Sequence, residues 1–155
     1  MYSVQGRTTT AGGSPEEVVA QLWNPHATAR IKIVQIMLCV NAAPGAGIAV
    51  RMKRVTGRGT AGSTVTPDIN NHLERSIAPA SGALLDLGNF SVNATIAASE
   101  LGPAWVAPVL RGSAWIYSIP GNMLIVTPGT GIAVVIVSNP AWPVTDVTFC
   151  WLEDW

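Results

Sequence analysis

The side chains that could act as acids, bases, nucleophiles or metal ligands are few in this chain and lie far apart. Its two histidines, His26 and His72, lie in polar or turn-rich stretches, without cysteines or histidines at the spacing that a metal site requires. Glu16 and Glu17 are adjacent, so their carboxylates diverge and cannot flank a scissile bond. No Gly-x-Ser-x-Gly motif marks a nucleophilic serine. The sequence therefore predicts no catalytic residue, no metal site and no cofactor, and it favours surface positions for both histidines.

Two loop segments match ligand-binding motifs only in part. Asp68, Asn70 and Asn71 carry oxygen ligands as in a calcium loop, but the glycine and the distant glutamate of that motif are missing. The glycine-rich run 57–62 lacks the Gly-Lys-Ser/Thr that opens a helix in a phosphate-binding loop. We interpret this run as a flexible connection between strands and assign no ion to the other segment.

The composition excludes several classes of function. The 155 residues have a net charge of zero, only 12% of them are charged, and 48% are hydrophobic. Intrinsic disorder requires low hydrophobicity and high net charge, and a surface that binds nucleic acid requires an excess of positive charge. A monomer this apolar and this neutral would be poorly soluble, so we expect other subunits to cover part of its surface.

Targeting segments and cysteines also limit the possibilities. We expect no secretory signal, because the start lacks an apolar segment, and no membrane helix, because prolines and glycines interrupt the uncharged stretch 112–145. The two cysteines, Cys39 and Cys150, each lie in an apolar run. We interpret them as two buried free thiols, with a single disulfide joining two strands as the alternative.

The elements that would position any site are short β-strands separated by Gly, Pro and Asn. Residues 48–53 and 91–98 alternate apolar and polar side chains, which is the period of a half-buried strand. The apolar face of the second segment consists of Val92, Ala94, Ile96 and Ala98. Runs 34–40, 132–137 and 147–152 are apolar on both faces, which indicates a second packing surface, either another sheet or another subunit. Strands are predicted near residues 2–10, 17–23, 29–42, 47–56, 91–98, 104–110, 113–119, 123–127, 131–138 and 144–153.

Two segments depart from this pattern. Residues 14–17, Ser-Pro-Glu-Glu, have the residue types of a helix start, but we expect only a short helical turn there, followed by an extended chain over 18–23. Residues 57–88 are predicted to be a long loop insertion, within which 68–76 is the best candidate for a short helix.

The tryptophans leave three interpretations open. Trp151 lies in a dense apolar strand and is predicted to be part of the core. The tryptophans near strand ends or turns are Trp105, Trp115, Trp142 and Trp155. Aromatic side chains at such positions cap a core, anchor a contact with another subunit, or form a platform for a sugar.

Several short segments together carry a resemblance to known proteins. They are residues 2–11, 14–15, 30–36, 53–57, 59–60, 65–67, 115–116, 120–122, 128–131, 147–149 and Glu153. These segments resemble a family of small phage virion proteins that are similar to capsid cement or decoration proteins with jelly-roll folds. The resemblance spans most of the chain. Residues 68–72 depart from it, since they read Asp-Ile-Asn-Asn-His where such proteins often carry a Leu-Asp-rich segment.

The resemblance implies a non-enzymatic component of the virion, located on the capsid surface after assembly in the host's bacterial cytoplasm. Such a protein is usually a homo-oligomer, for which we prefer a trimer, and it binds across subunits of the major capsid protein without nucleic acid, membrane or cofactor. We predict one all-β domain over 1–155, an antiparallel β-sandwich of jelly-roll type with an extended N-terminal arm at 1–14. The residues predicted to contact other subunits are Tyr2, Val4, Arg7, Trp105, Trp142 and Trp155.

Two other functions stay open at this point. A tail fibre or tail-tip module is also all-β and trimeric, and it would use exposed loops such as 57–88 to contact a host receptor. A carbohydrate-binding or hydrolytic β-sandwich would use Trp105, Trp115 or Trp142. Copy number in the virion distinguishes the first alternative, because a cement protein is abundant and a fibre is not.

Overall fold

Most of the described chain consists of extended segments with alternating burial. The computed structural model describes residues 1–8, 16–42, 48–66, 82–101, 105–107, 112, 114–118, 124–137 and 142–154. The strands are β1 (Tyr2–Arg7), β2 (Val18–Asn24), β3 (Arg30–Val40), β4 (Ile48–Gly57), β5 (Ser63–Val65), β6 (Leu84–Leu87), β7 (Thr95–Glu100), β8 (Trp105–Ala107), β9 (Ala114–Ser118), β10 (Leu124–Val126), β11 (Thr130–Ile136) and β12 (Thr145–Asp154). The described residues contain no helix, and the sheets are antiparallel, so the predicted all-β class is confirmed.

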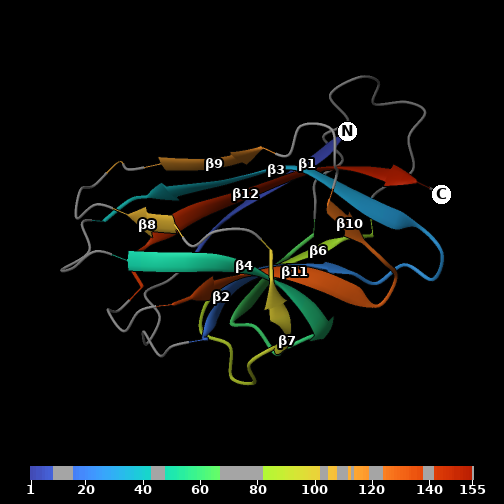
Figure 1. Ribbon diagram of the computed structural model, residues 1–155, viewed down its shortest axis with the longest axis horizontal. Coiled ribbons are helices and arrows are strands. Elements are labelled where there is room, and N and C mark those ends of the chain that lie inside the picture. Colours follow the sequence, from blue (N-terminus) through green and yellow to red (C-terminus); the bar gives the residue numbers. More distant parts are fainter. Residues whose placement is uncertain are drawn as a thin grey trace.

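The strands form two sheets that lie one above the other (Figure 1). The five-stranded sheet has the order β1-β12-β3-β10, and β9 also pairs with β3. The seven-stranded sheet has the order β5-β6-β2-β11-β4-β7, and β8 also pairs with β4. The pairings are nested along the chain: β1 pairs with β12, β2 with β11, β3 with β9 and β10, and β4 with β7 and β8. The first and last strands are therefore neighbours, with Tyr2 opposite Trp151.

The main core lies between the two sheets, because the long strands turn alternate apolar side chains inward. In β12, Val147, Phe149 and Trp151 are buried, whereas the residues between them are only half-buried. The ring of Trp151 stacks on Tyr2 of β1, with 5.9 Å between the ring centroids. Other large and fully buried side chains of this core are Leu22, Ile31, Ile33, Ile36, Leu38, Met52, Leu85, Ile132 and Trp142. The predicted core position of Trp151 is confirmed.

A smaller apolar cluster covers the outer side of the seven-stranded sheet. Strand β11 is buried on both faces: Ile132 and Val134 belong to the main core, while Ala133 and Val135 pack in the second cluster. The other members of this cluster are Val18, Val55 and Ala94, with Trp23, Phe90 and Ile96 packed against it. The second packing surface of the run 132–137 therefore comes from the chain itself rather than from another subunit.

The alternation predicted over 91–98 holds for only part of this segment. Ala94 and Ile96 pack in the second cluster as expected, but Val92 is 60% exposed and Ala98 is also exposed. Val92 forms only an isolated bridge with Thr60, and β7 begins three residues later. The pairing of β7 with β4 contains register shifts, so the two faces of the segment do not stay separate along its length.

The N-terminal segment differs from its prediction. Residues 2–7 of the predicted arm are β1, an edge strand of the five-stranded sheet, so the extended arm is not confirmed; residues 9–14 lie outside the described residues. Glu16 has a φ of 64°, a left-handed turn conformation in place of the expected helical turn. The extended chain predicted after it is confirmed, because β2 begins at Val18.

The predicted loop insertion 57–88 also has more structure than expected. Its described part contains β5 and β6, which extend the seven-stranded sheet beyond β2. Leu85 and Leu87 of β6 are buried in the main core, which explains why the segment forms a strand there. The candidate helix 68–76 lies outside the described residues.

Candidate interaction surface

The residues predicted to contact other subunits occupy different environments. Tyr2 and Val4 are 6% and 5% exposed, and Trp142 is fully buried. These three predictions are corrected, because the side chains fill the chain's own core and cannot reach a partner. Arg7 is exposed, as a contact residue should be. The side chain of Trp105, and Trp155 as a whole, lie outside the described residues.

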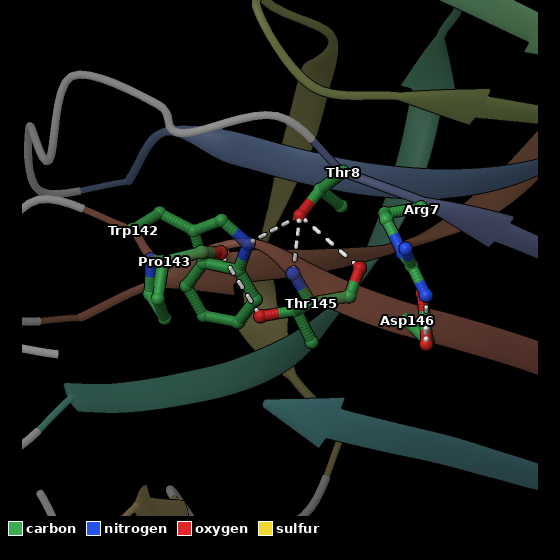
Figure 2. A network of polar contacts seen from close by, with 6 residues as sticks. All are labelled: Arg7, Thr8, Trp142, Pro143, Thr145 and Asp146. Atoms are coloured by element: carbon green, nitrogen blue, oxygen red, sulfur yellow. Dashed lines mark hydrogen bonds and ion pairs between the residues drawn. The ribbon is translucent and has the colours of Figure 1, made fainter. Parts of the chain in front are cut away.

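Trp142 takes part in a buried hydrogen-bond network with Thr8, the residue that follows β1. Figure 2 shows that its indole Nε1–H donates to the hydroxyl oxygen of Thr8, at 3.0 Å. The backbone N–H of Thr145 donates to the same oxygen at 3.1 Å, and the Thr8 hydroxyl lies 3.3 Å from the Thr145 carbonyl, to which it donates. Thr8 thereby satisfies two buried N–H groups and joins the end of β1 to the start of β12.

Arg7 forms a bidentate ion pair with Asp146 beside this network (Figure 2). Its Nε and Nη2 donate to the two carboxylate oxygens at 2.6 and 3.0 Å. These hydrogen bonds and the charge of Arg7 outweigh burial and lower the pKa of Asp146. The charge of Arg7 is thus neutralised within the chain, which weakens its case as an anchor for an acidic partner.

The outer side of the five-stranded sheet presents a regular grid of side chains, which we call the open face. One row across it runs Gln5, Thr148, Met37 and Ile116, from β1 through β12 and β3 to β9. The row on one side consists of Ser3, Cys150, Gln35 and Ser118, and the row on the other side of Arg7, Asp146, Cys39 and Ala114. Leu152, Lys32 and Ile125 continue the face toward β10.

The open face carries exposed apolar side chains among its polar ones. Ile116 is 64% exposed and Ile125 is 37% exposed, and Met37 and Leu152 are half-buried. An antiparallel sheet that faces water normally carries polar side chains on its solvent side, and exposed apolar patches mark contacts with other molecules. We therefore take the open face as the candidate interaction surface.

Sequence reasoning missed this surface for a physical reason. Trp115, Ile116 and Tyr117 are three consecutive large apolar residues, so the composition of β9 does not indicate which of them points outward. The pairing with β3 decides it: Trp115 and Tyr117 pack against the main core, which leaves Ile116 outside. Ala114 and Ser118, which are small or polar, lie two residues before and after Ile116, and this period of two was the sequence signal that Ile116 points outward.

Both cysteines lie on the open face and are free. Cys39 of β3 pairs with Asp146 of β12, and Asp146 lies four residues before Cys150 on the same strand. The two cysteines are therefore about 13 Å apart along the strands. A disulfide requires Cα atoms within about 7 Å, so the disulfide alternative is excluded, and both thiols are half-buried rather than fully buried.

We expect two alkylated cysteines when the unreduced protein is denatured with iodoacetamide and weighed by mass spectrometry. Burial raises the pKa of the Cys150 thiol, so native alkylation of this residue should need a higher pH than that of a free cysteine. An unmodified mass after denaturation, restored to two alkyl groups only by prior reduction, would contradict the assignment.

The remaining groups that sequence analysis considered for chemistry have structural partners. The side chain of His26 is 13% exposed, so this residue does not have the predicted surface position. Its Nε2 accepts a hydrogen bond from the Gly82 N–H at 3.2 Å and lies 3.8 Å from a carboxylate oxygen of Glu153. Glu16 forms an ion pair with Lys53, which is buried in β4. His72 lies outside the described residues.

Neither ligand clusters nor relatives assign a function. Within the described residues, no three His, Cys, Asp or Glu side chains come together as potential metal ligands. The same part of the chain has no helix with the length and apolar character needed to cross a membrane. The chain matches no protein-family model, no curated protein and no solved structure. The open face and the strand order are therefore the features of this chain that bear on its function.

Proposed function

We propose that this chain is a structural protein of a phage virion, a capsid cement or decoration protein that stabilises the head by binding across major capsid protein subunits. The observation that carries the proposal is the open face, a partly apolar sheet surface with neutral central rows and with Ile116 at its edge. A protein that works by contact needs such a surface and needs no titrating or metal-binding centre. Its place is the capsid surface, and its preferred form is a homotrimer.

The strand order supports a fold of jelly-roll type. Nested pairing of β1 with β12, β2 with β11, β3 with β10 and β4 with β7 is what results when one long antiparallel ribbon wraps into two sheets. β5 and β6 then form an insertion between β4 and β7. Jelly rolls are frequent in viral capsid domains and in lectins, so this fold is compatible with a virion component without specifying one.

Burial of apolar area on this face would contribute free energy to binding on the capsid. Burying apolar area contributes about 25 cal/mol per Å² before the costs of association, and symmetric repetition on a shell adds avidity. The net charge of zero supports contact with protein rather than with nucleic acid. For a sugar-binding function, by contrast, Trp142 is buried and Trp115 packs against the core, so neither offers an open platform.

Quantitative mass spectrometry of purified virions tests the proposal. We expect a copy number comparable to that of the major capsid protein, and density for the chain over the shell in cryo-electron microscopy. A few copies per particle, located at the tail, would instead support the tail-fibre alternative. Absence from purified particles would contradict a virion function altogether.

A further inference from the structure

The two outer faces of the sandwich are covered to different degrees. Over the seven-stranded sheet, Phe90, Ala94 and Ile96 of the chain itself pack on the apolar cluster. Over the five-stranded sheet, Ile116 keeps 64% of its surface exposed and belongs to neither apolar cluster of the described residues. The open face is therefore the outer surface that the described residues leave uncovered.

The charges of the open face point to an uncharged partner surface. Its charges lie toward its two ends, where Arg7 pairs with Asp146 and Lys32 with Asp154, and the exposed Arg30 lies opposite Asp154 at the same end. The rows between them contain only neutral side chains, such as Gln5, Thr148, Met37 and Ile116. A second copy presents the same neutral surface, so two copies can meet without like charges in contact.

The size of the open face fits a stable contact. Its strands β1, β12, β3 and β9 have 6, 10, 11 and 5 residues, which at spacings of about 4.8 Å and 3.3 Å cover roughly 500 Å² in projection. Stable interfaces bury about 600–1,000 Å² on each partner. The relief of the side chains adds to the projected area, which brings two copies joined through this face to the lower end of that range.

We propose that the open face is an interface between copies of this chain. Sheet surfaces pack on one another about 10 Å apart when apolar side chains interdigitate, and Ile116, Ile125 and Met37 supply such side chains here. The inference rests on the proposed function only in so far as that function calls for a homo-oligomer. Because each copy uses the same face, this contact joins copies in pairs about a twofold axis, so a homotrimer on the shell would use a different contact between copies and the shell would compete for the open face.

Sedimentation velocity of the purified full chain over a range of concentrations tests this interface. Ile116→Glu places a charge in the contact and should weaken self-association at least about tenfold. Val92→Glu is the matched control, because Val92 is 60% exposed but lies outside the open face, in the bridge with Thr60. This control should leave the association constant unchanged. Circular dichroism and thermal unfolding check that both variants are folded.

The thiol of Cys150, in the middle of the open face, provides a second measurement. Its rate of native alkylation should fall as the wild-type protein is concentrated, and it should not fall in the Ile116→Glu variant. A wild-type chain that stays monomeric, or equal association of the wild type and the Ile116→Glu variant, would overturn the inference. Virion content is measured separately, so the two proposals can fail independently. A monomeric chain found on capsids contradicts only this inference, and a self-associating chain absent from virions contradicts only the proposed function.

Discussion

Replacing Asp86 with alanine should lower the free energy of unfolding by about 2–4 kcal/mol. Asp86 is fully buried on β6 and accepts two hydrogen bonds from Arg58, at 2.8 and 2.9 Å. Thr64 on β5 donates to it at 2.6 Å and Gln21 on β2 at 2.7 Å. Its loss leaves these donors facing an empty site, while the partial exposure of Arg58 keeps the cost below that of a fully buried pair. Urea denaturation followed by tryptophan fluorescence measures the change.

Asp146→Ala is the matched control for this prediction. Asp146 also forms a bidentate pair with an arginine, but its partner Arg7 is mostly in water. Exposed ion pairs contribute little because solvent screens them, so the control should be much less destabilised than the Asp86 variant. Equal losses in the two variants would show that the buried network does not hold β5 and β6 on the sheet.

The Asp86 network should also make stability depend on acidic pH. Burial alone would raise the pKa of Asp86, but the hydrogen bonds from Arg58, Thr64 and Gln21 and the charge of Arg58 outweigh it and lower this pKa. A carboxylate whose pKa is lower in the folded state adds stability above the unfolded value of about 3.9, and this stability is lost as the pH falls through the folded value. The wild type should therefore lose stability more steeply below about pH 4 than the Asp86→Asn variant. Parallel curves would contradict this.

Replacing Trp142 with alanine should lower the free energy of unfolding by about 3–5 kcal/mol. The indole is fully buried in the main core, so its removal exposes a cavity and takes away the donor to Thr8. Trp142→Phe, the control, keeps an aromatic ring in the core but loses the N–H and part of the indole volume, for which we expect about 1–2 kcal/mol. The measurement also tests the corrected role of Trp142. A surface anchor would tolerate alanine with unchanged stability and would lose only binding to a partner.

Much of the strand arrangement can be predicted from local sequence. The period-two patterns and turn residues place β1 to β4 and β9 to β12 close to the segments predicted for them, because both signals act over a few neighbouring residues. Strands β5 and β6 were not predicted. They have three and four residues, too few for a clear period, and Asp86, a residue uncommon in strands, stands in one of them. That aspartate is tolerated because Arg58 and Gln21, distant in sequence, reach it.

The candidate site was less predictable than the strands. The expected N-terminal arm suggested an interface at Tyr2 and an aromatic position near a strand end suggested one at Trp142, yet the pairing of β1 with β12 and the packing of the sheets bury both. The exposed Ile116 lies between two aromatic residues that point inward, so only the pairing of β9 with β3 identifies it as a surface residue.

By itself, the sequence determined a strongly apolar, all-β chain without net charge, in which more hydrophobic side chains exist than one thin core needs. The tertiary structure alone decided which of these side chains the molecule covers with its own residues and which it leaves outside. Residue type indicates that a side chain is hydrophobic. Strand register and the stacking of sheets determine what shields it, because a shift of one residue moves a side chain to the opposite face.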